Sequence, residues 1–373
     1  MALTDKLSAI GDAIREKTGN SELLTLDAMP GEIRGIQSGG GIPEEALKLT
    51  GDCQHRFDGS YGWTWFLDEY GSQITTEDIT NANYLFRNAK VTEIPFDLNF
   101  KEGTPVTCDY MFNSCYYLTT IGKFKNFKPK TLSNMFRNAT RLRYLPEFEG
   151  LDTGYINNNS ADITYMFCQC QSLRRIDEDL LKRLYSCSTS RYSSPYYQSF
   201  WQCYTLDELK GLNFNPSIVW TDDMFYYTFN DSYRLKDVIF ATNDDGTTKV
   251  AKWKNQLIEL NSNIGYASNN FLHLNSGITA DKEVKDDATY QALKNDPDWF
   301  TQKLEYSRYN HDSAVNTINS LPDTSAYLAS NGGTNTIKFL GSAGSKTDGG
   351  AINTLTEAEI AVATAKGWTV TFV

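Results

Sequence analysis

Apolar residues recur at every third position in several short stretches of the chain. In the stretch "YMFNSCYYLTTI" these residues are Phe112, Cys115, Leu118 and Ile121. The same order returns elsewhere, with an aromatic residue first, a small residue three positions later and two aliphatic residues after that. Further copies begin at Phe136, Phe167, Phe200 and Phe229, and a copy shortened by one residue begins at Phe86. Unrelated amphipathic helices would not keep the small residue at a constant offset, so the stretch is one unit of a repeat.

Successive repeat Phe residues lie 24 to 33 positions apart, and periods of 20 to 50 residues are typical of solenoid proteins. A unit of this size cannot bury its apolar face alone, whereas stacked units share one core. We therefore predict that the Phe rings stack along that core. The residue three positions later must be small because neighbouring backbones approach there, and the aliphatic pair leads into a short strand.

The motif Met-Phe-x-x-Cys-x-x-Leu-x-x-Ile/Leu resembles the BspA-like leucine-rich repeats of bacterial and bacteriophage surface proteins, over residues 81–241. Residues 3–41, "LTDKLSAIGDAIREKTGNSELLTLDAMPGEIRGIQSGGG", resemble the leader of phage tail, fibre and baseplate proteins. The end of the chain resembles the closing unit that follows such repeats in phage proteins. The resemblance implies an α/β fold, a leucine-rich-repeat solenoid with capping units and a small N-terminal helical module.

The first residues alternate apolar and charged positions with helical spacing. Leu3, Leu7, Ile10 and Ile14 share one face of this helix. The segment lacks the basic start and apolar core of a signal peptide. Because such a short helix is marginal in water by itself, we expect this face to attach the chain to another protein or to a second copy.

The last residues predict a helix and two strands. Thr356 and Glu359 have the spacing of a capping box for a helix over 355–366. Gly367 then ends the helix, residues 368–373 alternate as an edge strand, and residues 336–340 form another strand. Together they predict a cap that shields the last layer of the repeat.

These patterns divide the chain into six parts. They are an attachment or oligomerisation module (1–37), a glycine-rich linker (38–41), an N-terminal cap (42–80), the repeats (81–241), an insertion-rich segment (242–298) and a C-terminal α/β cap (299–373). In the N-terminal cap, Trp63, Trp65 and Phe66 are expected to seal the first repeat.

Composition excludes several classes of protein. The net charge of −11 and the pI of about 4.9 argue against a nucleic-acid surface, which needs a concentrated basic face. No apolar run is long enough to span a membrane. The seven cysteines form no CxxC pair, so we interpret them as free thiols in buried positions, with no metal site and no cofactor.

No catalytic motif is present. "GSAGSKTDGG" lacks the Gly-Lys-Ser/Thr ending of a phosphate-binding loop, and no G-x-S-x-G or H-E-x-x-H sequence occurs. In "YNHDS", His311 adjoins Asp312 and Ser313, which a helix N-cap explains better than a catalytic triad. We therefore expect a protein that is not an enzyme, although a distant carboxylate pair for glycan cleavage stays open.

Aromatic residues cluster where the repeat does not require them. The residue after each repeat Phe is mostly polar, which predicts a solvent-facing position, and Trp201 is the exception there. Around it and one repeat later lie Tyr192, Tyr196, Tyr197, Tyr204, Tyr226 and Tyr227. Three interpretations stay open for these rings: contact with an external ligand, a subunit contact, and burial within the chain.

Together with the resemblance, these features predict a non-enzymatic bacteriophage virion protein, a tail fibre or receptor-binding component. Its expected partners are other tail proteins, a host cell-surface glycan or protein, and further copies of itself, without membrane insertion. It would fold in the host cytoplasm and leave in the virion by lysis. Baseplate and capsid-decorating roles stay open, and the alternative is a cellular BspA-like surface adhesin or protein-interaction module.

Overall fold

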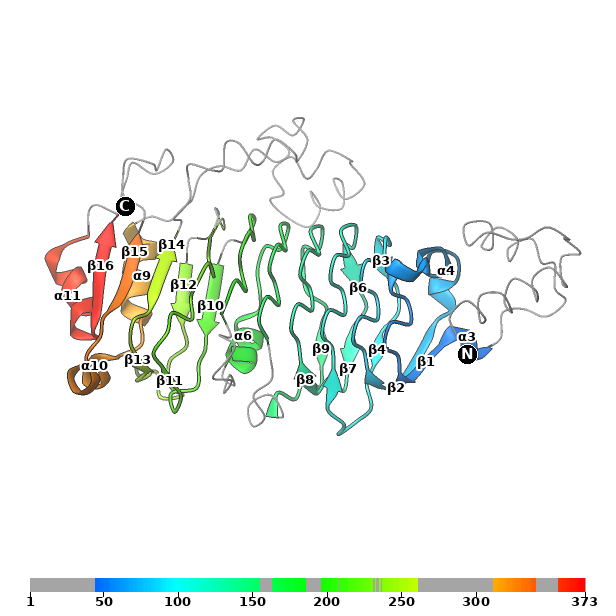
Figure 1. The fold of residues 1–373 in the computed structure, drawn as a ribbon, viewed down its shortest axis with the longest axis horizontal. Helices are drawn as coiled ribbons and strands as arrows, with labels where there is room; N and C mark the ends of the chain where they lie inside the picture. The colour runs from blue at the N-terminus through cyan, green and yellow to red at the C-terminus, as the bar shows by residue number, and fades with distance from the viewer. Residues whose placement is uncertain are drawn as a thin grey trace, which may run out of the picture.

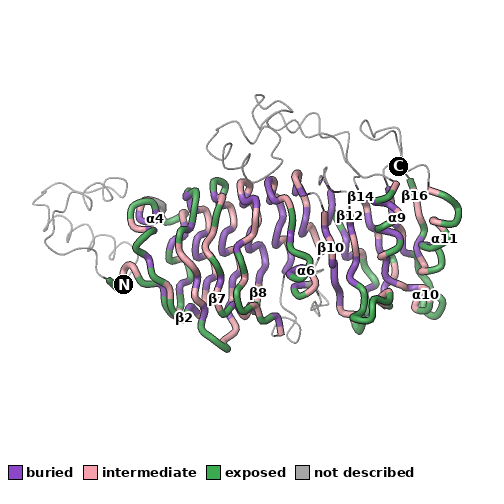
Figure 2. Tube along the Cα trace, turned by 180° about the vertical axis from the view of Figure 1, so that it is seen from behind, coloured by how far each residue is buried: buried purple, intermediate pink, exposed green. Residues whose placement is uncertain are grey.

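The computed structural model describes residues 44–154, 163–185, 196–206, 208–230, 232, 235, 237–260, 311–339 and 355–372. They form a mixed α/β structure in which small parallel sheets predominate. The backbone runs in successive coils that lie side by side along the long axis (Figure 1). We use the word coil for one circuit of the backbone, carrying one ring of the Phe repeat. Buried residues recur at the same place in successive coils (Figure 2).

The described strands are short. They are β1 (Lys48–Asp52), β2 (Thr75–Asn81), β3 (Glu93–Ile94), β4 (Leu98–Asn99), β5 (Val106–Thr107), β6 (Thr120–Ile121), β7 (Phe124–Lys125), β8 (Pro129–Thr131), β9 (Phe148–Glu149), β10 (Glu208–Leu212), β11 (Val219–Trp220), β12 (Asp237–Phe240), β13 (Lys252–Trp253), β14 (Leu257–Leu260), β15 (Asn335–Phe339) and β16 (Trp368–Phe372). The helices are α3 (Glu44–Leu47), α4 (Thr64–Tyr70), α6 (Glu178–Tyr185), α9 (His311–Ser320), α10 (Ser325–Asn331) and α11 (Glu357–Ala365), with 3-10 turns η1 (Gly59–Tyr61) and η2 (Gly71–Gln73).

All strand pairs in the described residues are parallel. The largest sheet has the order β1-β2-β5-β8, and a second row has the order β4-β7-β9. Smaller sheets pair β3 with β6, β10 with β12, and β11 with β13, and the last sheet has the order β14-β15-β16. Parallel pairing follows from the coils, because each coil places an equivalent segment one layer further along the axis.

The repeat Phe rings form one continuous stack. Neighbouring ring centroids lie 5.4 to 6.2 Å apart, and the planes are within 22° of parallel. All of the rings are at most 2% exposed. The stack comprises Phe57, Phe86, Phe112, Phe136, Phe167, Phe200 and Phe229. The predicted stacking is thus confirmed, and Phe57 adds a ring inside the segment that we expected to be only a cap.

Left-handed backbone flanks most of these rings. Two positions before each Phe the φ angle lies between 51° and 59°, at His55, Tyr84, Tyr110, Asn134, Tyr165, Gln198 and Tyr227. Two positions after it, Asn88, Ser114, Asn138, Gln169 and Gln202 have φ between 58° and 62°. This conformation costs an L-residue about 1 kcal/mol or more. Hydrogen bonds between coils offset that cost, as where the Phe86 N–H donates to the Met111 carbonyl at 2.9 Å.

The small residue three positions after the Phe is more than a space-saving residue. The thiols of Cys115, Cys170 and Cys203 donate to the carbonyl oxygen of the Phe in the preceding coil at 3.0 to 3.1 Å. The Ser232 hydroxyl makes the same bond to Phe200 at 2.7 Å. Our interpretation of these cysteines as small apolar residues was therefore incomplete, because each one also gives a second hydrogen bond to a carbonyl that already accepts a backbone N–H.

Substitutions at Cys170 separate these two roles. We expect Cys170→Ser to retain most of the stability, because Ser232 makes the same bond in its own coil. Cys170→Ala removes the donor and should cost about 1 kcal/mol. Cys170→Val adds a methyl group where the coils approach and should cost about 1–3 kcal/mol through overpacking. Denaturant midpoints measure all three, and a valine variant as stable as the parent would contradict the close approach.

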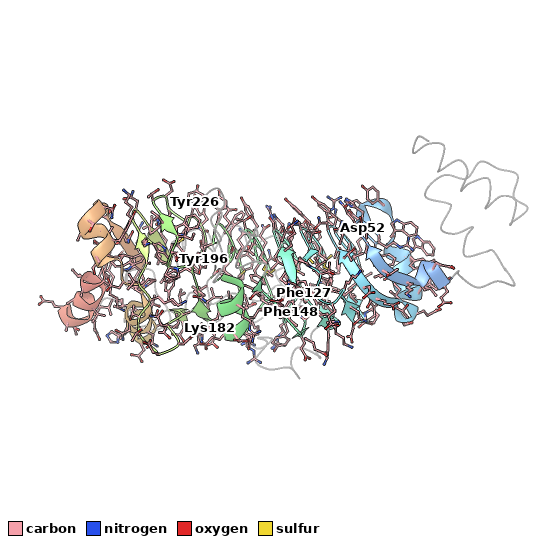
Figure 3. All side chains as sticks on the ribbon, turned by 90° about the horizontal axis from the view of Figure 1, so that it is seen from below. Asp52, Phe127, Phe148, Lys182, Tyr196 and Tyr226 are labelled. Carbon is pink, nitrogen blue, oxygen red and sulfur yellow. The ribbon has the colours of Figure 1, made fainter. Side chains whose placement is uncertain are left out.

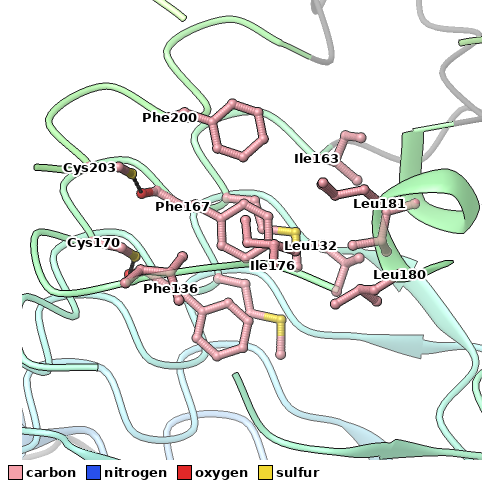
Figure 4. Close-up of a cluster of buried hydrophobic side chains, with 14 of the residues drawn as sticks. Leu132, Phe136, Ile163, Phe167, Cys170, Ile176, Leu180, Leu181, Phe200 and Cys203 are labelled. Atoms are coloured by element: carbon pink, nitrogen blue, oxygen red, sulfur yellow. Dashed lines mark hydrogen bonds between the residues drawn. The ribbon is translucent and has the colours of Figure 1, made fainter. Parts of the chain in front are cut away.

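Helix α6 interrupts the row of strands that ends at β9. Its residues Leu180 and Leu181 turn toward the core beside Leu132 and Ile163 (Figure 4). Gly211 of β10 lies against the helix at φ 84°, and a Cβ there would lie 2.9 Å from the Glu178 carbonyl oxygen. The helix therefore lies close to the next coil and has a surface hollow on each side.

Different elements lie at the two ends of the row of coils (Figure 1). Phe66 of α4 packs on Phe57 with centroids 5.8 Å apart, and Trp65 packs against the core, whereas Trp63 is 40% exposed. Of the three expected sealing residues, Phe66 and Trp65 thus lie against the core.

At the other end, the Thr356 hydroxyl and the Glu359 carboxylate form the predicted capping box of α11. Gly367 follows the helix with φ 83°, and β16 is the edge strand, as expected. Strand β14 pairs with β15, so the described part of the segment 242–298 shares a sheet with the C-terminal unit.

Candidate functional site

The structure places the predicted contact residues in three kinds of environment. Tyr226 and Tyr227 are 45% and 43% exposed. Tyr197, Trp201 and Tyr204 are half-buried. Tyr192 and the predicted attachment residues Leu3, Leu7, Ile10 and Ile14 lie outside the described residues.

Tyr196 corrects the sequence-based expectation, because it is fully buried. Its ring stacks on Phe225 at 5.0 Å, and its hydroxyl donates to the backbone carbonyl of Asn213. It lies four positions before Phe200, the inward position that Leu132 and Ile163 occupy in their own coils. A residue in the core cannot contact an external ligand, so Tyr196 is structural.

The tyrosines near the surface form a continuous group, which we call the aromatic strip and which comprises Tyr165, Tyr197, Tyr226 and Tyr227. Tyr165 meets Tyr197 edge to face at 5.4 Å, Tyr197 stacks on Tyr226 at 5.5 Å, and Tyr226 meets Tyr227 edge to face at 4.2 Å. Arg137 covers Tyr165 with its guanidinium carbon 5.0 Å from the ring centroid. The strip thus spans three coils, and its exposed end is the Tyr226–Tyr227 pair.

The residue after each repeat Phe does not face solvent in every coil, which corrects a second expectation. Cys168 and Asn230 are buried at this position. Arg87 and Arg137 are half-buried and lie over the rings of Tyr84 and Tyr165. The half-buried Trp201 is therefore less unusual than its sequence context indicated, and the exposed aromatic surface lies on the tyrosines beside it.

Two phenols of the aromatic strip, those of Tyr165 and Tyr226, have raised pKa values. A hydrogen bond with Tyr227 raises the pKa of Tyr226. Burial raises the pKa of Tyr165, and the neighbouring Tyr197 raises it further. Neutral phenols both donate and accept hydrogen bonds. Rings with such hydroxyls offer a contact surface that is apolar in the middle and polar at its edge.

A second row of rings in the first coils was not predicted. His55 stacks on Tyr84 at 4.6 Å, and Tyr84 stacks on Tyr110 at 5.0 Å. These rings cover one another's faces, as Tyr197 covers one face of Tyr226, whereas Tyr226 and Tyr227 meet edge to face. The signal was in the sequence, because His55, Tyr84, Tyr110 and Tyr165 all lie two positions before a ring of the Phe stack.

A buried carboxylate lies beside this second row. Asp58 is 0% exposed and accepts hydrogen bonds from the Ser60 N–H at 3.0 Å and the Arg87 Nε at 3.0 Å. Its Oδ2 also lies 2.9 Å from His55 Nδ1. Burial alone would raise the pKa of Asp58, but these bonds outweigh it and hold the pKa below its usual value. The cluster joins the first two coils.

The described residues contain no group of His, Cys, Asp and Glu side chains that could hold a metal ion. The described cysteines are buried, and burial raises the pKa of Cys53 and of Cys168 to about 11. Thiols in this state are protonated at neutral pH and are therefore weak nucleophiles and weak metal ligands.

Helix α9 begins at His311, so Asp312 and Ser313 lie in its first turn. Both residues lie inside the helix, so the expectation that one of them is its N-cap is wrong. His311 lies 3.2 Å from Asp312 Oδ1 and 3.3 Å from Glu359 Oε2, and the second contact joins α9 to α11. Ser313 is buried.

Comparison with protein-family models, with curated proteins and with solved structures gives no match. Among the described residues, no helix has both the length and the apolar character required to cross a membrane. The geometry of the structure therefore has to identify the candidate site, and it points to the aromatic strip. The strip lies on the opposite side of the body from α6, as the positions of Tyr226 and Lys182 show (Figure 3).

Proposed function

We propose that this chain is a non-enzymatic structural protein of a bacteriophage virion, a tail fibre or receptor-binding component that contacts the host surface through its repeats. The repeats belong, in this proposal, to a leucine-rich-repeat solenoid of the BspA-like kind. The stacked Phe rings and the parallel strand pairs support that assignment. The resemblance of both ends of the chain to phage tail proteins supports the virion role.

One observation carries the binding part of the proposal. Tyr226 and Tyr227 are exposed although they adjoin the buried Phe225 and lie in the same coil as the stacked Phe229. Tyrosine gives a large, rigid contact area at a small entropic cost, and it is frequent among residues that dominate binding energy. An exposed pair that continues a row of half-buried rings therefore suits a host glycan or protein surface.

The N-terminal module supplies the attachment in this proposal. Leu3, Leu7, Ile10 and Ile14 would pack on another tail protein or on further copies of the chain. They precede Tyr226 by more than 200 residues, so attachment and host contact would involve different parts of the chain. The protein would be delivered in the virion, after folding in the host cytoplasm.

The double variant Tyr226→Ala/Tyr227→Ala tests the proposed contact. We expect phage particles that carry it to adsorb to host cells at least tenfold more weakly. The reason is that truncating an aromatic residue that dominates an interface costs about 2 kcal/mol or more of binding energy. The thermal midpoint should change little, since both side chains are more than two-fifths exposed. Adsorption and thermal unfolding are measured on the same preparation.

The chain contains a matched control for this experiment. Tyr116 and Tyr117 are also adjacent and are 48% and 43% exposed, but they lie outside the aromatic strip. Tyr116→Ala/Tyr117→Ala should leave adsorption unchanged. Equal losses in the two double variants, or no loss at Tyr226 and Tyr227, would contradict the proposal.

A further inference from the structure

A hollow of about 550 Å³ lies on the side of α6 that faces the loop after β12. Its walls come from α6 (Lys182, Arg183), from Asn213 after β10 and from residues 241–249. Volumes of about 300–1,000 Å³ are usual for small-molecule sites. The hollow lies away from Tyr226 (Figure 3), so it is separate from the aromatic strip.

Lys249 differs from the other cations of the hollow. Lys182 pairs with Glu178 at 2.6 Å, and Arg183 pairs with Asp179 at 2.8 Å. The Lys249 ammonium instead donates to the side-chain oxygen of Asn213 at 2.6 Å, and no ion pair joins it to a carboxylate in the described part of the chain. An ammonium has three N–H donors, so Lys249 has donors left for a ligand.

Asn213 holds that ammonium in place. It is 8% exposed, and its amide nitrogen donates to the Lys182 carbonyl at 2.7 Å. Its side-chain oxygen also accepts from the Phe214 N–H at 2.9 Å. Burial lowers the pKa of Lys249, against the opposing effect of Asp244. A bound anion would stabilise the charged form and would thereby regain part of the cost of burial.

The charges and polar groups of the hollow restrict the chemistry of the ligand. Two of its three cations, Lys182 and Arg183, are already paired with the carboxylates of Glu178 and Asp179. Lys249 has no such ion pair among the described residues, and only the charge of the nearby Asp244 acts on it. A single ammonium of this kind suits a monoanion better than a dianionic phosphate ester. Hydroxyl and amide groups of Thr153, Thr242 and Asn243 complete the lining, and such groups suit a ligand with several hydroxyls.

We propose that this hollow binds an acidic monosaccharide unit, with its carboxylate on Lys249 and its hydroxyls against the polar wall. The site does not depend on the aromatic strip or on the virion role. It would give the chain a contact for acidic glycans that is separate from the aromatic strip, on the side of the body opposite Tyr226.

Calorimetric titration of the full chain with glucuronate tests this proposal, with glucose and inorganic phosphate as comparison ligands. We expect glucuronate to bind, and glucose and phosphate to bind at least tenfold more weakly. Lys249→Gln should weaken glucuronate binding at least tenfold while its amide keeps a donor for Asn213. The matched control Lys338→Gln changes a lysine that is ion-paired with Glu259 elsewhere in the fold, and it should leave the affinity unchanged.

The alternative results are decisive. Equal binding of glucuronate and glucose would show that the carboxylate is not recognised. Tighter binding of phosphate than of glucuronate would show that the ligand is not an acidic sugar. An unchanged affinity in a Lys249→Gln variant with the parent's thermal midpoint would place the ligand elsewhere and overturn the site. The same conclusion follows if glucuronate does not bind to the parent protein.

Discussion

Replacing Phe136 by alanine is expected to lower the free energy of unfolding by about 3–5 kcal/mol, the usual cost of deleting a buried aromatic ring. The ring is 0% exposed and lies between Phe112 at 5.5 Å and Phe167 at 6.0 Å. Its removal leaves a cavity bounded by two other rings of the stack, which the flanking coils cannot fill without losing their own hydrogen bonds. Denaturant unfolding monitored by far-UV circular dichroism measures the change.

Two further variants sharpen this test. Phe136→Leu retains part of the apolar volume and should cost less than the alanine variant. Tyr116→Ala removes an aromatic ring that is 48% exposed. It should leave the free energy of unfolding within about 0.5 kcal/mol of the parent's, as surface substitutions usually do. A Phe136→Ala midpoint equal to that of the parent would mean that this ring does not stabilise the stack.

Replacing Asp58 by alanine is expected to cost about 1.5–3 kcal/mol, since it removes a buried, charged acceptor from several hydrogen bonds. The Arg87 guanidinium makes contacts of 2.8 and 3.0 Å with this carboxylate, and the Ser60 N–H makes another of 3.0 Å. Asp58→Asn keeps the shape but loses the charge, so we expect it to be intermediate. The exposed Asp244→Ala is the control, and a similar loss there would refute the special role of Asp58.

The same carboxylate predicts how stability depends on pH. The folded-state pKa of Asp58 is lower than its unfolded value, which is about 3.9. The unfolded state therefore binds the proton more readily, and the contribution of Asp58 is fully present above the unfolded pKa. It is lost as the pH falls through the folded pKa. Relative to the parent, Asp58→Asn should thus show a weaker loss of stability between about pH 5 and pH 2.

The repeat positions were predictable because burial restricts them in every coil. A ring at Phe136 and a small residue at Ala139 are both required wherever coils stack, so the pattern is visible in the sequence. The ring of Phe57 was not predicted because only the small residue, Ser60, follows it at the usual spacing, and the aliphatic pair is replaced by Trp63 and Phe66. Its burial against Phe86 depends on a contact between coils, which local spacing does not reveal.

The site was less predictable, because exposure depends on which way a turn directs each side chain. Tyr196 and Tyr197 are neighbours in sequence, yet one is in the core and the other is in the aromatic strip. The left-handed residue Gln198 follows them, and the sequence does not mark it as glycine would. The sequence did not indicate a role for Lys249, because the hollow arises where α6 meets a loop more than 55 residues away in the sequence.

The direction of the hydrogen bonds between coils has a mechanical consequence. Bonds such as Phe112 N–H to the Met135 carbonyl and Phe136 N–H to the Met166 carbonyl join one coil to the next, so they run along the long axis of the body. A force that pulls the two ends apart would load these bonds in tension, one layer at a time. We therefore expect the chain to yield under load by peeling single coils from an end, in small steps that dissipate energy, while the remaining coils stay folded.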